Sequence, residues 1–414
     1  MSQSISNVLD VNREYRRPFG HKAEKTLHRV TYNPSSAQPG ETLYIHLPKL
    51  DENVVYVPGS IGLTFDLNLN TEKHANNRLV NNISRNIISS MKVSYGGETL
   101  QDTDRVDLLE TYKDLYLTKE HRENMLREGI SSVNMHKLRA SAGDKVTTDI
   151  KEVALASVYS TKYRMAINHP IIDSHGVFYA KGLSHNLLFQ VKLTESKDLV
   201  ISSDTSKSYS YSLSNIQLEY ECIKSDFLSK EALSTYQVGR GFYFENVLLH
   251  KTLQITRNTD SVINEHINIP RRSMNGILML FVEPYTICTR DTEKFVYPNL
   301  TELNVNIDGL PNKLFSKGMT KTDFWTAAIR KFGLSDNVKQ KDFYSDKFCL
   351  WIDLRLYPDD DIHGNGLHLN STKDGIQLEI KRDTTGTGKL NCYIYVLADA
   401  MMEIQDSNLK SILF

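Results

Sequence analysis

Apolar and polar residues alternate with a period of two through most of this chain. Leu63, Phe65 and Leu67 alternate with polar residues in the segment GLTFDLNL, and LLFQVKL, residues 187–193, repeats the pattern. Neighbouring side chains of a strand point to opposite faces of a sheet, so each such segment predicts a half-buried β-strand. Similar segments follow at 216–222, 350–356, 376–382 and 390–398. The pattern predicts an all-β chain.

One combination of elements occurs twice. Residues 91–117 read as a strand, a Gly96-Gly97 turn, a short strand and a helix, and residues 303–332 repeat this order around Asp308-Gly309. Glycine adopts the positive φ that a two-residue hairpin turn requires. Apolar residues at helical spacing predict the two helices. They are Val106, Leu109, Tyr112 and Tyr116 in the first copy, and Phe324, Trp325, Ala328, Ile329 and Phe332 in the second.

The ends of these helices carry capping signals. Thr103 or Asp104 is expected to cap the first helix, and Thr320 or Thr322 the second. Gly333 follows the second helix, where a left-handed C-terminal cap is favoured. A further helix is expected from Lys119 to Arg127, closed by Gly129.

The remaining segments also repeat in order. EHINIPRR corresponds to YIHLPKL, GILMLFVEPY to SIGLTFDLNL, and GIQLEIKR to LLFQVKL. The second member of the middle pair is apolar on both sides, which predicts deeper burial. Strands are kept while loops differ, as expected of duplicated β-domains. Residues 130–156 are polar and weakly patterned, and are expected to form a surface excursion.

These observations divide the chain into an arm and two domains. We expect an N-terminal arm at 1–31, a first sandwich at 32–224, a connector at 225–241 that changes to helical spacing, and a second sandwich at 242–414. The jelly roll is the eight-stranded member of this fold class. The sequence therefore predicts two tandem eight-stranded antiparallel sandwiches with short inserted helices.

The composition narrows the classes of function that the chain is expected to have. The 414 residues are 40% hydrophobic with a formal net charge of −1, which indicates no global attraction to nucleic acid. No run approaches the roughly 18 apolar residues of a membrane span, and MSQSISNVLD lacks the apolar core of a signal peptide. We therefore expect a protein that is synthesised and folded inside a cell and is not secreted through a signal peptide.

The arm is the basic part of the chain. Arg13, Arg16 and Arg17 are its central cations, joined by Lys22, Lys25 and Arg29. It is interpreted either as a tail that docks on a neighbour or contacts an acidic partner, such as a genome or an inner surface, or as a solvated terminus.

The four cysteines, Cys222, Cys288, Cys349 and Cys392, lie far apart in the sequence and have no zinc-ligand spacing. Cys222 and Cys392 stand within apolar strands. We expect free, buried thiols that pack as small apolar side chains.

Three segments resemble pieces of catalytic or binding motifs. Asp359, Asp360, Asp361 and His363 could ligate calcium, but EF-hand spacing is missing, and a solvated loop is favoured. TTGTGKLN has the wrong spacing for a phosphate loop and predicts a hairpin turn. Asp173-Ser174-His175 places hydrolytic residue types side by side, where strand geometry points them to opposite faces. We therefore predict no catalytic, cofactor-binding or metal-binding residues and no enzymatic activity.

Four segments together resemble the double jelly-roll major capsid proteins of nucleocytoplasmic large DNA viruses and Polinton/Maverick-type elements. They are MKVSYGGETLQDTDRVDLLETYKDL, SLSNIQLEYECIKSDFLSKEAL, LNVNIDGLPNKLFSKGMTKTDFW and WIDLRLYPDDDIHGNGLHLNST. The resemblance spans residues 40–405 and depends on ordered spacing. The run of aspartates departs from the Gln-Pro-Ser-Gly that family members often show. This departure and the short loops favour a compact, Polinton-like or small double-stranded DNA virus member.

The resemblance implies a structural protein of the virion. Three chains would form a homotrimeric, pseudo-hexameric capsomer that contacts neighbouring capsomers, penton proteins and minor capsid proteins in an icosahedral shell, with no small-molecule substrate. Two alternatives remain open. One is a tandem β-sandwich carbohydrate-binding or adhesion protein, and the other is a hydrolase that uses the Asp359 to His363 loop as a metal site.

Overall fold

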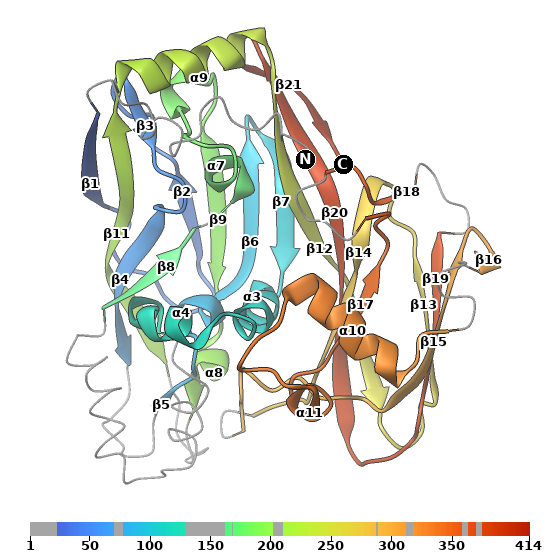
Figure 1. The fold of residues 1–414 in the computed structure, drawn as a ribbon. Coiled ribbons are helices and arrows are strands. Elements are labelled where there is room, and N and C mark those ends of the chain that lie inside the picture. Colours follow the sequence, from blue (N-terminus) through green and yellow to red (C-terminus); the bar gives the residue numbers. More distant parts are fainter. Residues whose placement is uncertain are drawn as a thin grey trace. The chain divides into compact units, whose positions relative to one another are not determined.

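The computed structural model describes residues 23–69, 78–129, 162–167, 169–201, 210–286, 289–311, 318–357, 363–369 and 375–414 (Figure 1). Arg13, Arg16, Arg17, Cys288, the aspartates at 359–361 and the excursion expected at 130–156 lie outside these ranges. The described chain consists mostly of antiparallel strands, as the alternation predicts.

The first eight main strands form two sheets. One has the order β1 (Glu24–Thr31), β11 (Tyr211–Lys224), β4 (Gly62–Leu69), β8 (Lys162–Ala166), with β3 (Val54–Tyr56) also paired to β11. The other has the order β2 (Thr42–His46), β9 (Leu187–Leu193), β6 (Ile88–Tyr95), β7 (Glu98–Asp104). A separate pair joins β5 (Arg78–Leu79) to β10 (Val200–Ile201).

The next eight main strands repeat this arrangement. One sheet has the order β12 (Arg240–Thr256), β20 (Lys389–Gln405), β14 (Arg271–Val282), β17 (Cys349–Asp353), with β18 (Leu367–Leu369) beside β14 and β21 (Asn408–Leu413) beside β20. The other has the order β13 (Val262–Ile267), β19 (Ile376–Arg382), β15 (Leu300–Ile307), β16 (Leu310–Pro311).

The two halves have the same topology. When the main strands of each half are counted along the chain, the first lies beside the eighth, the eighth beside the third and the third beside the sixth. In the other sheet the second lies beside the seventh, the seventh beside the fourth and the fourth beside the fifth. Two sheets connected in this way form an eight-stranded jelly roll. The predicted fold class and the duplication are therefore confirmed.

Both predicted hairpin turns are present. Gly96 and Gly97 have φ of 60° and 92°, and Asp308 and Gly309 have φ of 51° and 75°. Positive φ at both central residues matches the right-handed twist of the flanking strands. The helices that follow are α3 (Val106–Asp114) and α10 (Lys321–Phe332).

The capping predictions were right for one helix and wrong for the other. Thr320 caps α10 in a capping box with Asp323, and Gly333 follows the helix with φ 84°. At α3 the N-cap residue is Arg105, with φ 53°, and neither Thr103 nor Asp104. The hydroxyl of Thr103 instead donates to the carbonyl oxygen of Val247 in β12, 2.6 Å away. Thr103, which the local sequence offers as a cap, therefore uses its hydroxyl for a tertiary hydrogen bond instead.

The remaining helices are short, apart from the connector. The helix expected from Lys119 appears as α4 (Lys119–Asn124) followed by η1 (Leu126–Glu128) and Gly129. The connector is α9 (Asp226–Val238), whose first turn is capped by the Ser225 hydroxyl and which ends at Gly239. The others are α2 (Ile83–Asn86), α7 (Pro170–Asp173), η2 (Ala180–Gly182), α8 (Ser196–Leu199) and α11 (Gln340–Phe343). No helix among the described residues is both long and apolar enough to cross a bilayer.

The chain forms two compact units that do not follow chain order. The first contains the chain up to Asp102 together with 125–244 and 400–413, and the second contains 103–124 with 245–399 and Phe414. Thus α3 and α4, which follow the first copy of the repeated turn, pack in the second unit. Leu109, Tyr112 and Leu115 are buried in its core. Of the arm expected at 1–31, Glu24–Thr31 form β1 of the first sheet. The other boundaries expected from the repeat remain a proposal for the domains.

Candidate functional site

The Asp173-Ser174-His175 segment supports the backbone around α7. His169 precedes this helix, and its Nδ1 accepts a hydrogen bond from the N–H of Ile171. The Asp173 carboxylate accepts hydrogen bonds from the N–H groups of Gly59 and His169 at 2.7 and 2.8 Å. Burial raises the pKa of Asp173 and lowers that of His169 to about 3. These contacts hold loops together and arrange no nucleophile beside a base.

The other candidates also occupy structural positions. The loop between β19 and β20 has Gly386 and Gly388 at positive φ. The prediction of a hairpin turn here is wrong, because β19 and β20 belong to different sheets and the loop crosses from one sheet to the other. Cys222, Cys349 and Cys392 are free and buried, which confirms the expectation for these three. Burial raises the pKa of Cys349 to about 12.

His363 is the one residue of the acidic loop that the structure describes. Its Nδ1 lies 3.6 Å from Oδ1 of Asp399. The Asp399 carboxylate also accepts hydrogen bonds from Asn275, Ser273 and the N–H of Gly364. Burial alone would raise the pKa of Asp399, but these hydrogen bonds hold it below its ordinary value. Among the described residues, no three histidine, cysteine, aspartate or glutamate side chains gather as metal ligands. The absence of catalytic and metal sites over the whole chain remains a prediction.

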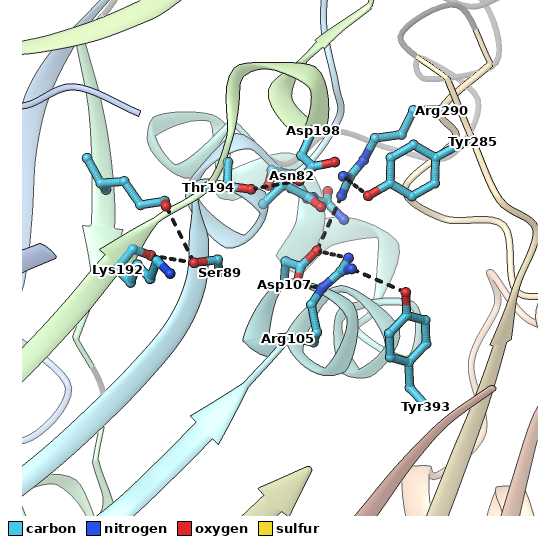
Figure 2. Close-up of polar contacts among 12 residues, drawn as sticks. Asn82, Ser89, Arg105, Asp107, Lys192, Thr194, Asp198, Tyr285, Arg290 and Tyr393 are labelled. Carbon is cyan, nitrogen blue, oxygen red and sulfur yellow. Dashed lines mark hydrogen bonds and ion pairs between the residues drawn. The ribbon is translucent and has the colours of Figure 1, made fainter. Parts of the chain in front are cut away.

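Sequence reasoning missed a buried ionic cluster at the start of α3 (Figure 2). Arg105 donates to both carboxylate oxygens of Asp107, at 2.9 and 2.7 Å, and to the hydroxyl of Tyr393 at 3.2 Å. Arg290 lies 3.4 Å from the same carboxylate and donates to the Tyr285 hydroxyl at 2.7 Å. Burial lowers the pKa of Arg105, but the charge and hydrogen bonds of Asp107, together with the nearby Tyr393 and Tyr285, outweigh burial and the pKa is raised. Two guanidinium groups saturate Asp107, so this cluster clamps the helix start and offers no free base.

The first unit has a comparable cluster on the outer face of β11. Glu219 is nearly inaccessible, and Arg29 of β1, Arg127 of η1 and Arg164 of β8 donate to it at 2.7, 3.2 and 3.2 Å. Each arginine comes from a different element, so the carboxylate joins all of them to the sheet. Burial alone would raise the pKa of Glu219, but the arginine hydrogen bonds lower it below its ordinary value of 4.5.

Replacement of Glu219 by glutamine should reduce the acid sensitivity of the first unit. Because the folded-state pKa is lowered, the carboxylate contributes stability above about pH 4.5 and loses it as the pH falls through the folded-state value. We expect Glu219→Gln to cost about 1–2 kcal/mol at pH 7, since two of the three arginines are half exposed. The slope of unfolding free energy against pH below 5 should become shallower.

Urea unfolding at a series of pH values measures both effects. The matched control is Glu221→Gln on the same strand, where the carboxylate is more exposed and pairs with Lys25. Its expected cost is below about 0.5 kcal/mol. Equal effects of the two substitutions would contradict the role given to Glu219.

The first unit also has an open strand edge at β2. Among the described strands β2 pairs with β9 alone, and the hydrogen bonds at both ends of this ladder involve the odd-numbered residues Glu41 and Leu47. The backbone groups of Thr42, Tyr44 and His46 therefore face away from the sheet. An open groove of about 710 Å³ runs beside this edge. It is lined by Tyr32, Asn33, Pro34, Glu41, Thr42, Leu43, Tyr44 and His46.

Comparison with known proteins identifies the fold. No family model and no curated protein sequence matches the chain. Solved structures do match over nearly the whole length. The capsid structure of the virus PBCV-1 aligns with a TM-score of 0.61 and 11% identity, covering 94% of this chain and 97% of that one.

Two further structures give the same result. The Sputnik virophage structure aligns with a TM-score of 0.58 and 10% identity, covering 94% of this chain and 88% of that one. The mavirus major capsid protein aligns with a TM-score of 0.53 and 8% identity, covering 93% of this chain and 89% of that one. The fold of this chain is therefore the double jelly roll that these structures have.

Proposed function

We propose that this chain is a major capsid protein, a structural component that assembles as a homotrimer into the icosahedral shell of a double-stranded DNA virus. The observation that carries the proposal is the repeat of one eight-stranded topology within a single chain. Three copies supply six similar jelly rolls, which approximate a hexagon and can tile a curved surface. The similarity to viral capsid structures over more than nine-tenths of the chain supports the same role.

The finer parts of the proposal concern partners and location. We place the protein in the virion, where it would contact its own copies and neighbouring capsomers, with penton and minor capsid proteins as further partners. Arg13, Arg16 and Arg17 would allow weak contact with a genome or an inner surface. The carboxylates of Asp107 and Glu219 are each bonded to arginines, which suits a structural protein better than an enzyme.

The adhesion alternative is not favoured. A carbohydrate-binding sandwich would present a platform of exposed aromatic rings. The described residues include the exposed rings of Tyr44, Tyr243 and Tyr357, which belong to β2, β12 and the segment after β17. The structures similar to this chain are viral capsid proteins.

The purified protein should behave as a trimer. With a chain mass of 47.3 kDa, light scattering coupled to gel filtration should give about 142 kDa, and electron microscopy should show particles with a hexagonal outline. A stable monomer at micromolar concentration would contradict the proposal. Replacement of Asp359, Asp360 and Asp361 by asparagine should leave assembly unchanged, whereas these residues would be essential to a metal-dependent hydrolase.

A further inference from the structure

We propose that the open edge of β2 receives residues 1–22, the part of the N-terminal arm before β1, from a second copy of this chain as an added strand. The inference rests on the proposed function, because a shell places copies side by side. It names the contact through which one copy would be tied to the next.

The edge offers hydrogen-bonding groups on one side of a regular strand. Thr42, Tyr44 and His46 each present an N–H and a carbonyl away from β9, while Leu43 and Ile45 point into the core. A row of such unpaired groups is a template for strand addition. The side chains of Tyr44 and His46 are exposed, so the outer face of the strand is also accessible.

One residue of this edge is occupied in the free chain by a side chain. The Tyr32 hydroxyl donates to the carbonyl of Tyr44 at 3.0 Å and accepts from the N–H of the same residue at 2.8 Å. A single hydroxyl thus imitates the two hydrogen bonds that a strand residue would make. It satisfies two of the six outward groups, and an added strand in its place would satisfy all six. The Tyr32 hydroxyl therefore occupies the backbone groups of Tyr44 in the free chain, and an added strand would displace it.

Residues 1–22 are long enough to supply the added strand, and their sequence is suited to it. Twenty-two residues precede the described chain and span up to about 73 Å when extended. A unit of roughly 200 residues has a radius of gyration of only about 16 Å, so an extended segment of this length is long enough to reach beyond its own unit. Ile5, Val8, Leu9 and Val11 give its first half the β-branched and apolar character of a strand. In the proposed complex the cations at Arg13, Arg16 and Arg17 would follow this strand, and the groove beside the edge offers them the carboxylate of Glu41.

Binding of a synthetic peptide of residues 1–22 to protein lacking those residues tests the site. Fluorescence anisotropy should show saturable binding, and Tyr32→Phe should tighten it by about five- to tenfold, since the competing hydroxyl is gone. Two N-methylated peptides test whether the bound peptide forms a strand. One is methylated at Ile5, Asn7, Leu9 and Val11, and the other at Ser6, Val8 and Asp10.

An added edge strand bonds through every second residue. One methylated peptide should therefore bind like the parent while the other loses at least tenfold. Absence of peptide binding, or equal loss with both peptides, overturns the inference.

Cross-linking of the full-length protein identifies the donor of the arm. Val8→Cys combined with Thr42→Cys should give disulfide-linked dimers and larger species on a non-reducing gel, and each single variant serves as a control. A product that runs only as a cross-linked monomer means that the arm folds back on its own chain, and overturns the assignment to a second copy. Trimers with a hexagonal outline that bind no peptide would leave the proposed function standing and remove this inference alone.

Discussion

Replacement of Arg122 by methionine is expected to lower the free energy of unfolding of the second unit by about 3–5 kcal/mol. The Arg122 and Glu293 side chains are 0% and 1% exposed, and the guanidinium group contacts the Glu293 carboxylate directly. Another N–H of Arg122 donates to the carbonyl of Asp114, 2.9 Å away. Methionine fills similar space but leaves Glu293 buried without this cation. The penalty for that buried charge is the largest part of the expected loss.

A double-mutant cycle separates the charge from the packing. Arg122→Met with Glu293→Met should recover most of the stability, because both charges are then removed together. Urea unfolding measures all three variants against the parent. Hydrogen exchange should show faster opening of α3 and α4 in Arg122→Met, since Arg122 joins α4 both to the end of α3 and to Glu293. If Arg122→Met and the double variant were equally destabilised, lost packing and not the unpaired charge would account for the lower free energy of unfolding.

This ion pair also shows where sequence reasoning ends. Arg122 and Glu293 are 171 residues apart, and neither stands in a pattern that marks it as buried. The polar helix around Arg122 reads as a surface element. Only the packing of α4 against the rest of the second unit converts an ordinary arginine into a buried one. The signal available was the apolar face of α3 with Tyr112 and Tyr116, which predicts a core but cannot say which core.

Local features were predicted well because their causes are local. The strands follow from a period of two, and the turns at Gly97 and Gly309 follow from the positive φ that their positions require. The duplication could be found because both copies keep these features in order. The cap of α3 could not, because Thr103 is drawn to the carbonyl of Val247, a neighbour that the sequence does not reveal.

The candidate site at the edge of β2 also combines a local feature, which the sequence reveals, with a tertiary feature, which it does not. The sequence matches YIHLPKL to EHINIPRR as a repeated segment, yet nothing in these residues says that β2 lies at the edge of its sheet. That property depends on which strands pair with β9. The hydroxyl of Tyr32 at this edge depends in turn on the chain between β1 and β2. The edge position of β2 and the position of Tyr32 beside it depend on the topology of the sheet. They become visible only when the strand pairing is known.

Gly276→Ala is expected to destabilise the second unit by about 3 kcal/mol or more, and Gly62→Ala the first unit by about half of that. The two glycines hold equivalent positions in the duplicated fold. Gly62 of β4 pairs with Ala166 of β8, and Gly276 of β14 pairs with Asp353 of β17. At each, a Cβ would meet the carbonyl oxygen of the residue before its partner, at 2.8 Å for Gly62 and 2.5 Å for Gly276.

The difference lies in the side chain two residues before the partner. For Gly62 it is Arg164, whose Cζ would be 2.9 Å from the new methyl group and whose long side chain can shift. For Gly276 it is Trp351, which is wholly buried and would be 2.4 Å away at Cη2. Thermal or urea unfolding of the two variants compares the same substitution at one topological position. Addition of Trp351→Phe to Gly276→Ala should restore part of the loss, because the smaller ring withdraws the closest atoms. Equal costs in the two units would mean that the strand backbones, and not the neighbouring side chains, require glycine here.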